Sequence, residues 1–287
     1  SINSHTSCFL SNILEEIFLN IPHRQVVRVC RLVCRRWREA ADSESLWRQK
    51  CRRERFHLHD ATKAPADWRI FYFLCKNRRN LLKNPSGEDK LKGWLLFDGS
   101  PKHWMVSRIT QPHPNEKVQT NFVTSYGVCR KAQFIDLKKE GYSPSFMDEF
   151  QPDIKLTDWY TAPWDLGCEY MICVKLLNER KEVLAGFTPD PVNSGPLDEW
   201  IHVCTKFKTK CVTHVFRGYG PGVRYICFIH GSRVRRFWAE CCGIHLADSC
   251  IEIFPAGDLY MNKAYTFSQA GLTLQSRASV QVFETSD

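Results

Sequence analysis

The chain has 287 residues, of which 43% are hydrophobic and 25% charged, and its formal net charge is +9. This composition is typical of a globular protein and excludes a disordered one. No run of eighteen apolar residues occurs, which excludes a membrane-spanning helix, and the first residues lack the basic and long apolar regions of a signal peptide. We therefore expect a protein of the cytoplasm, or at least of a reducing compartment, with one large and one small domain.

The fourteen cysteines are scattered, mostly within apolar runs, and no C-x-x-C pair occurs. Cys30 and Cys34 share a helical stripe, and the adjacent Cys241 and Cys242 have a poor geometry for chelation. We interpret the cysteines as buried, reduced thiols that act as small hydrophobic side chains. The sequence therefore predicts no metal site and no cofactor.

Arginines concentrate in residues 28–55 and again at Arg233, Arg235 and Arg236. A basic balance of charge can indicate nucleic-acid binding. No nucleic-acid-binding motif accompanies these arginines, so we interpret them as residues of solvated helix faces. We expect no nucleic-acid partner.

Three short helices are predicted near the N-terminus. Apolar residues recur at helical spacing in residues 10–21, where Ser11 can cap the start and Pro22 stops the helix. A second apolar stripe follows in residues 26–41, with arginines between the apolar positions, and Ser45 can cap a third helix. Helices this short bury little by themselves, so a partner or a following domain normally completes such a bundle. The first helices of a larger core are the alternative.

The sequence of this stretch also resembles a known family. The run IP-x-RQ-V-V-x-x-C-RLVC-x-x-W-R, followed by Leu46 and Trp47, closely resembles an F-box. In that family the short helices bind the Skp adaptor of a cullin–RING ubiquitin ligase. The family's usual Leu-Pro-Glu before the first helix is replaced here by residues 9–11 (Phe, Leu, Ser), so the proline and the acid are lost. The resemblance implies that a set of apolar residues contacts the adaptor: Phe9, Leu10, Ile13, Leu14, Ile17, Phe18, Val26, Val27 and Leu32.

From Asn84 onward the apolar pattern changes to the period of two that is typical of β-strands. About ten short runs rich in β-branched and aromatic residues are separated by clusters of Gly, Pro, Asn and Asp. One brief helix is predicted near Lys138–Phe150, and another from Pro65, which carries Trp68, Phe71, Tyr72 and Cys75 on one side. We therefore predict an α+β multidomain chain: a small N-terminal helical domain, a helical linker and a C-terminal antiparallel β-sandwich.

The predicted domain boundaries follow these changes in pattern. We place the F-box at residues 5–51, a linker at 52–67, the sandwich at 68–254 and a loose tail at 255–287. The tail contains one last apolar run at residues 278–283.

The predicted sandwich also resembles a known domain. The blocks RNLLKNP-x-G, FVTSY-x-x-C-x-KAQ-x-IDL-x-x-EGY, PDI-x-x-x-DWY, D-x-G-C-x-Y, GPGVRYI-x-F-x-HG and FWA match, in order, the F-box-associated (FBA) domain of the sugar-recognising F-box proteins. That family folds the domain as a ten-stranded, jelly-roll-like antiparallel sandwich. Its members bind the inner, chitobiose core of high-mannose N-glycans and deliver misfolded glycoproteins to the ligase for ER-associated degradation.

The resemblance implies a sugar-binding site formed by Tyr126, Asp165, Phe237, Trp238 and Ala239. A sugar ring has an apolar face that packs on an aromatic side chain, and its hydroxyls need a few fixed polar groups. Tyr126 could instead be packing within a strand, and Asp165 could be a turn residue. Two stretches depart from the family pattern, residues 240–242 (Glu, Cys, Cys) and 248–250 (Asp, Ser, Cys), so sugar binding could be weakened or altered.

No catalytic constellation is evident. The histidines form no metalloprotease or nucleophile-elbow motif. Asp158 and Asp165 are the nearest carboxylates in the expected pocket and could suggest a glycosidase pair, without further support. Our first interpretation is therefore a non-enzymatic substrate receptor that binds the Skp adaptor, and through it cullin and RING subunits, and N-glycosylated misfolded proteins. A diverged lectin or chaperone-like binder without the ligase link is the second interpretation, and a glycan-processing enzyme is the third.

Overall fold

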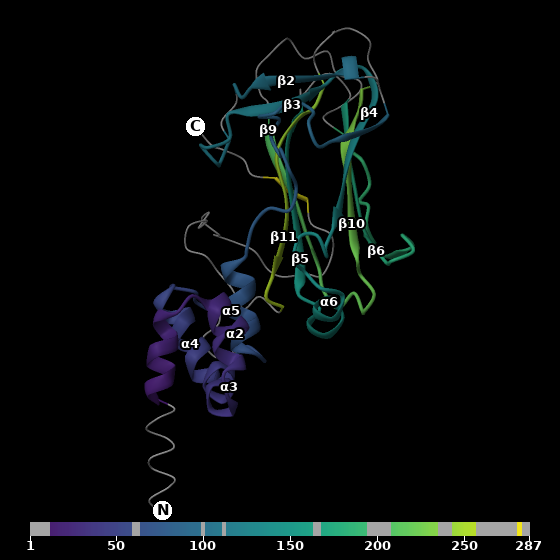
Figure 1. The fold of residues 1–287 in the computed structure, drawn as a ribbon. Coiled ribbons are helices and arrows are strands. Elements are labelled where there is room, and N and C mark those ends of the chain that lie inside the picture. The colour runs from purple at the N-terminus through teal and green to yellow at the C-terminus, as the bar shows by residue number, and fades with distance from the viewer. Residues whose placement is uncertain are drawn as a thin grey trace, which may run out of the picture. The chain divides into compact units, whose positions relative to one another are not determined.

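The computed structural model describes residues 12–58, 64–98, 101–110, 113–162, 168–193, 208–234, 243–256 and 280–282 (Figure 1). The described residues form two compact units. The first, which we call the helical unit, contains residues 12–78 and 254–256. The second, the sandwich, contains residues 79–253 and 280–282.

The helical unit is built from short helices. Its first helix covers residues 12–20 and ends before Pro22, as predicted, with a bend at Ile21 between them. The second predicted stripe is not one helix, because the chain is extended at Cys34, where φ is −160° and ψ is 174°. Cys30 is still buried, but Val33 and Cys34 are exposed, which corrects the prediction for these two residues. The remaining helices are α2 (His23–Arg28), η1 (Cys30–Leu32), α3 (Arg35–Asp42), α4 (Glu44–Arg53) and α5 (Trp68–Lys76).

Two helix starts differ from the prediction. The N-cap residue of α4 is Ser43, and the predicted cap Ser45 instead donates a 2.5 Å hydrogen bond from its hydroxyl to the Glu15 carboxylate. Helix α5 begins at Trp68 and not at Pro65, because the Asp67 carboxylate accepts hydrogen bonds from the backbone N–H groups of Arg69 and Ile70 at 2.7 and 3.1 Å. A side-chain acceptor at this position satisfies backbone donors that have no partner within the helix.

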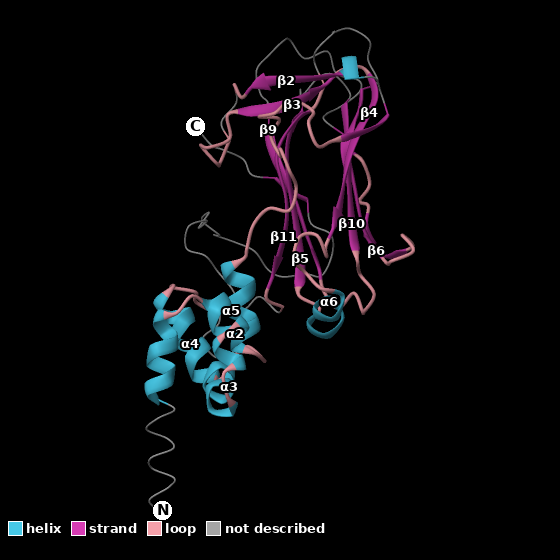
Figure 2. Cartoon of the chain, viewed as in Figure 1, coloured by secondary structure: helices cyan, strands magenta, loops and turns pink. Residues whose placement is uncertain are grey.

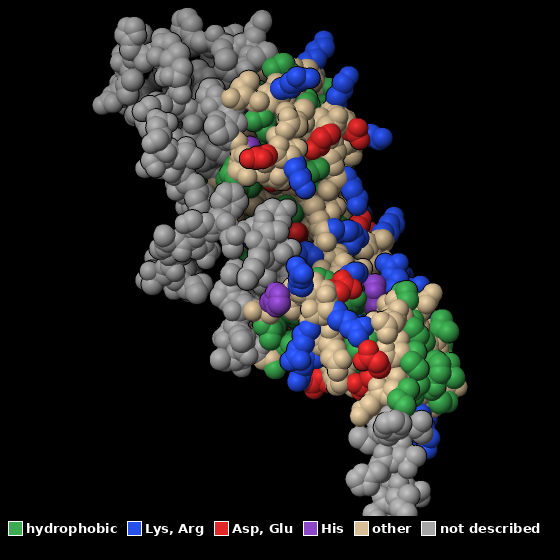
Figure 3. All heavy atoms as spheres, turned by 90° about the vertical axis from the view of Figure 1, so that its left-hand side faces the viewer, with side chains coloured by type: hydrophobic (Ala, Val, Ile, Leu, Met, Phe, Trp, Pro, Cys, Tyr) green, Lys and Arg blue, Asp and Glu red, His purple; other side chains and the backbone are tan. Residues whose placement is uncertain are grey.

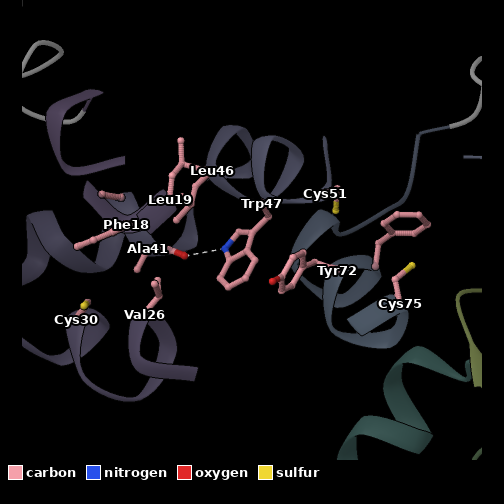
Figure 4. Packing of buried hydrophobic residues seen from close by; sticks show 12 residues of the cluster. Phe18, Leu19, Val26, Cys30, Ala41, Leu46, Trp47, Cys51, Tyr72 and Cys75 are labelled. Carbon is pink, nitrogen blue, oxygen red and sulfur yellow. Dashed lines mark hydrogen bonds between the residues drawn. The ribbon is translucent and has the colours of Figure 1, made fainter. Parts of the chain in front are cut away.

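Trp47 lies at the centre of the core of the helical unit (Figure 4). Its side chain is completely buried, and its indole N–H donates a 2.8 Å hydrogen bond to the carbonyl oxygen of Ala41. The ring of Tyr72, on α5, lies 5.4 Å from the Trp47 ring. Phe71 and Cys75 of the same helix are also buried in this cluster, so α5 completes the helical core.

This packing moves a domain boundary. We predicted that the sandwich begins at Trp68, but the helical unit extends to Arg78 and includes α5. The predicted linker also contains the end of α4. The contacts of Tyr72 explain the difference, because a helix that packs on Trp47 belongs to the core of the helical unit.

The sandwich consists of two antiparallel sheets, as predicted (Figure 2). In the first sheet the strand order is β1-β4-β10-β6-β7, with β8 paired to β6, and in the second it is β12-β9-β5-β11-β3-β2. The strands of the first sheet are β1 (Leu95–Asp98), β4 (Gly127–Asp136), β6 (Cys168–Leu177), β7 (Val183–Phe187), β8 (Val192–Asn193) and β10 (Tyr225–Val234). Those of the second are β2 (Trp104–Arg108), β3 (Thr120–Thr124), β5 (Asp153–Ala162), β9 (Lys208–Phe216), β11 (His245–Phe254) and β12 (Val280–Val282).

The short elements show what the strand pattern predicted and what it missed. The brief helix is α6 (Pro144–Phe150), within the range we predicted, and a further turn of 3-10 helix, η2 (Pro101–His103), precedes β2. Strand β1 was not predicted. The tail is not uniformly loose, because residues 280–282 pair with β9 as β12. One of the short apolar runs that predicted a strand, at residues 200–207, lies outside the described residues.

Candidate functional site

The helical unit exposes a group of aliphatic side chains, which we call the apolar face. Figure 3 shows hydrophobic side chains gathered on one side of this unit. The aliphatic side chains of this face are 41% to 66% exposed, and an exposed group of apolar residues of this kind is typical of an interaction site. The exposed members are Ile13, Ile17, Val29, Leu32 and Val33.

The break between α2 and α3 contributes three of the five members of the apolar face, Val29, Leu32 and Val33. Val29 follows α2 in a non-helical conformation, and its N–H still bonds to the carbonyl oxygen of Gln25. The next turn, η1, then directs Leu32 away from the core, where it is 66% exposed.

Two predicted adaptor contacts are core residues. Phe18 and Val26 are completely buried within the helical unit, and the Phe18 ring packs edge-on against Trp37 at 5.2 Å. Both belong to the core of the helical unit and not to its exposed surface, and their contact with the adaptor stays a prediction. Of the other predicted residues, Ile13, Ile17 and Leu32 are exposed and Leu14 and Val27 are half-buried, whereas Phe9 and Leu10 lie outside the described residues.

Several arginines of the helical unit form ion pairs on its surface. Asp42 accepts from Arg31 at 2.8 Å and from Arg69 at 2.7 Å, which ties α3 to α5. Arg53 pairs with Glu16 at 2.9 Å. Pairs of this exposure contribute little each, but they show that the basic charge of this region is distributed over solvated helix faces.

In the sandwich, only one predicted sugar-site residue lies within the described part of the chain. This is Tyr126, between β3 and β4, whose side chain is 45% exposed. The other four, Asp165, Phe237, Trp238 and Ala239, lie outside the described residues. The described geometry of the candidate site is therefore that of Tyr126 and its neighbours.

Tyr126 has an aromatic neighbour that the sequence did not indicate. The imidazole of His103, at the end of η2, lies 4.9 Å from the Tyr126 ring at an interplanar angle of 55°. His103 is half-buried. No motif pointed to it, because the contact depends on the pairing of β2 with β3, which brings residues 103 and 126 together.

A buried polar network connects the two sheets of the sandwich. The Asp158 carboxylate accepts hydrogen bonds from the hydroxyls of Tyr170 at 2.5 Å and Ser249 at 2.7 Å, and lies 2.7 Å from Nδ1 of His230. Nε2 of His230 lies 2.6 Å from the Lys131 ammonium. All five side chains are fully or almost fully buried, and they come from β4, β5, β6, β10 and β11.

Aromatic rings surround the buried lysine. Nζ of Lys131 lies 3.2 Å from the centre of the Trp94 ring and 3.6 Å from that of Phe122, positions that favour a cation. Burial nevertheless lowers the pKa of Lys131 well below its usual value, and Asp158 opposes this shift. Burial also lowers the pKa of His230 to about 4, against the attraction of Asp158. His230 is thus neutral at pH 7 and bridges Lys131 and Asp158.

This network excludes the glycosidase interpretation for Asp158. Its carboxylate is completely buried, with hydrogen bonds to three side chains, so it does not line a surface pocket. A general acid or base must reach the substrate directly or through one water. The prediction that Asp158 belongs to a sugar pocket was wrong: Asp158 holds the two sheets together.

Other chemistries find little support in the described part of the chain. Among those residues, no group of three or more His, Cys, Asp or Glu side chains could hold a metal ion. Their cysteines are free thiols, and burial raises the pKa of the Cys211 thiol to about 11, which makes it unreactive at neutral pH. No helix within the described ranges is long and apolar enough to span a membrane.

Comparisons with known proteins agree with this architecture. A family model described as F-box-like matches residues 11–53, and one described as F-box associated region matches residues 72–253. The chain is 42% identical to F-box only protein 6 of Bos taurus over 84% of its length and 90% of that protein. It is 41% identical to F-box only protein 44 of Homo sapiens, over 85% of this chain and 94% of that one. It is 39% identical to F-box only protein 6 of Homo sapiens, over 95% and 94% of the two chains.

Both halves of the chain, a helical unit with an exposed apolar face and an antiparallel sandwich, thus have matches in the same relatives. The match covers most of the chain and most of each relative. The chain belongs to the F-box proteins that carry an F-box associated region.

Proposed function

We propose that this protein is the substrate-recognition subunit of a Skp–cullin–F-box (SCF) ubiquitin ligase. The helical unit binds the Skp adaptor through its apolar face, and the adaptor links it to the cullin and RING subunits. The exposed aliphatic side chains of Ile17 and Leu32 support this, because water contact of such residues is unfavourable until a partner covers them. The F-box-like match over the same helices supports the identity of that partner.

We propose further that the sandwich binds the inner, chitobiose core of high-mannose N-glycans on misfolded glycoproteins. The observation that carries this proposal is Tyr126, an exposed aromatic ring at one end of a rigid sandwich. A ring held in this way can pack on the apolar face of a sugar. Fixed donors and acceptors around it then select among hydroxyl patterns.

The protein itself catalyses no reaction in this scheme. It holds a glycoprotein near the ubiquitin-charged enzyme and so raises the local concentration of the substrate. The consequence is ubiquitination of the glycoprotein and its ER-associated degradation, with the receptor in the cytoplasm. The complete burial of Asp158 supports a binding role over glycan hydrolysis.

A titration with a high-mannose glycopeptide tests the sugar-binding half of the proposal. Tyr126→Ala should weaken binding by about thirtyfold, the loss typical of a central aromatic contact, with little change in melting temperature. Phe150→Ala is the matched control, since Phe150 is a 40% exposed aromatic on α6, at the other end of the sandwich (Figure 1). A parent protein that binds no glycopeptide would contradict this half of the proposal.

The second candidate function is a diverged lectin or chaperone-like binder without the ligase link. The replacement of Leu-Pro-Glu by residues 9–11 (Phe, Leu, Ser) favours it. Co-purification of the full chain with the Skp adaptor separates the two candidates. Glycan binding without adaptor binding would support the second.

A further inference from the structure

We propose that His103 is a specificity-determining residue of the sugar site, and that it forms a two-ring platform with Tyr126. The inference rests on the proposed sugar binding and deepens it. The two rings lie 4.9 Å apart and are tilted by 55°, so they present two differently oriented walls to one ligand. Tyr126 is exposed and His103 half-buried, so each keeps surface that a ligand can reach.

The backbone around the platform is firmly held. The carbonyl oxygen of His103 accepts a 2.9 Å hydrogen bond from the Ser125 N–H, next to Tyr126. The Cys129 thiol lies within 3.9 Å of the same oxygen and 3.8 Å from that of Tyr126. Trp104, the residue after His103, is buried and pairs in register with Thr124. Both rings therefore extend from a backbone that is fixed on either side.

Thr124 fixes this end of the sandwich further. Its hydroxyl accepts hydrogen bonds from the Ser232 hydroxyl at 2.6 Å and the Ile244 N–H at 2.9 Å, which joins β3 to β10 of the other sheet and to the start of β11. A Cβ on Gly243 would lie 2.0 Å from the Thr124 carbonyl oxygen, so only glycine allows this approach. A platform built on such a backbone loses little conformational entropy when a ligand binds.

His103 adds chemistry that Tyr126 lacks. A neutral imidazole carries one N–H donor and one nitrogen acceptor, whereas the tyrosine ring offers mainly an apolar surface beside its single hydroxyl. The ligand that fits both is an N-acetylhexosamine unit, whose C–H face can pack on Tyr126 while a hydroxyl or the acetamido group bonds to the imidazole. The pair therefore selects for this sugar class.

The test uses the full chain and N,N′-diacetylchitobiose as the probe, with binding and melting temperature measured on each variant. His103→Ala removes ring and nitrogens, and we expect about a tenfold loss of affinity. His103→Phe keeps a ring without nitrogens, and we expect about a threefold loss. His113→Ala is the matched control: His113 is a half-buried histidine that packs on Trp159 at 5.3 Å, and its removal should leave affinity unchanged.

The outcomes separate the two proposals. If the parent binds the probe and His103→Ala binds equally well or more tightly, His103 is no wall of the site and the inference is overturned. Parental affinity in His103→Phe would overturn the hydrogen-bonding role alone, and an equal loss in His113→Ala would overturn the specific role of His103. A parent protein that binds no sugar would overturn the proposed function, and this inference with it.

Discussion

The helical unit and the sandwich use their polar and apolar residues in opposite ways. The helical unit leaves aliphatic residues such as Ile17 and Leu32 exposed, although it has only a small core. The sandwich places ionisable residues such as Asp158 and Lys131 in its interior, completely buried. The first arrangement leaves apolar surface that a protein partner can cover, and the second fixes the position of two sheets whose end presents a pair of rings.

One buried lysine in each unit sharpens the contrast. Lys50 of the helical unit donates to the carbonyl oxygens of Leu19 at 3.4 Å and Ile21 at 2.9 Å, where it closes the end of the first helix. Lys131 of the sandwich lies between aromatic rings and the imidazole of His230. Burial lowers the pKa of both lysines. Lys50 thus satisfies carbonyl oxygens at the end of one helix, whereas Lys131 belongs to a network that connects the two sheets.

The largest effect is expected from breaking this network. Asp158→Ala leaves Lys131 and His230 buried without their carboxylate, and removing one partner of a buried charged pair costs about 3–5 kcal/mol. Denaturant unfolding of the sandwich measures the loss. Glu149→Ala, at an exposed carboxylate of α6, is the control and should change stability by less than about 0.5 kcal/mol. A loss below about 1 kcal/mol for Asp158→Ala would show that Asp158 is not one partner of a buried charged pair.

The next effect concerns the apolar face and leaves folding intact. Ile17→Asp places a charge where the adaptor is proposed to bind, and should reduce adaptor affinity by about 2 kcal/mol or more, roughly thirtyfold. Ile17 is 47% exposed, so the melting temperature of the Ile17→Asp variant should hardly change. Leu14 is half-buried, so a charge there would also destabilise the fold, and a loss of binding could not be assigned to the surface. Val183→Asp, at a 54% exposed residue of the sandwich, is the control in an adaptor pull-down. Unchanged capture of the adaptor by Ile17→Asp would exclude this face as its binding site.

A pH dependence of similar size should belong to the sandwich. The pKa of His230 is lowered from 6.5 to about 4, so between these values the unfolded state binds the proton and the folded state does not. Stability is therefore fully present above pH 6.5 and is lost as the pH falls toward 4, by about 2 kcal/mol between pH 7 and 5. His230→Gln should flatten this slope in unfolding measurements, and His57→Gln, an exposed histidine, should not. If His230→Gln leaves the slope unchanged, the pH dependence of stability belongs to other buried histidines.

The smallest effect tests the start of α5. Asp67→Ala removes the acceptor for two backbone N–H groups and should cost about 1 kcal/mol. The loss should appear as faster hydrogen exchange of the amides of α5. Asp67→Asn keeps an acceptor and should exchange almost like the parent. Equal exchange in all three proteins would mean that packing of Tyr72 on Trp47 alone holds this helix.

The alternation of side chains along β5 indicates that Asp158 is buried. Ile154, Leu156, Asp158 and Tyr160 share one face of β5, and the three others are buried, so the alternation itself places Asp158 inside. The partners of Asp158 could not be predicted, because His230 and Ser249 are far away in the sequence and only sheet pairing brings them together.

The helical unit shows the opposite limit. The spacing of apolar residues predicted its helices. The break before α3 could not be predicted in this way, because no proline or glycine marks it. It follows from how Val26 and Cys30 pack into the core while Leu32 turns outward. The resemblance gave Tyr126 as a candidate, but no sequence signal indicated His103, because its contact with Tyr126 arises from the pairing of β2 with β3.

The position of α5 has a consequence for exchanging modules between relatives. The F-box-like match ends at residue 53 and the F-box associated match begins at residue 72, inside α5. A chimera joined at either limit would separate Tyr72 from Trp47 or pair it with a foreign surface. The helical unit that packs as one core extends through Arg78, so a successful graft of one relative's helical unit should include α5.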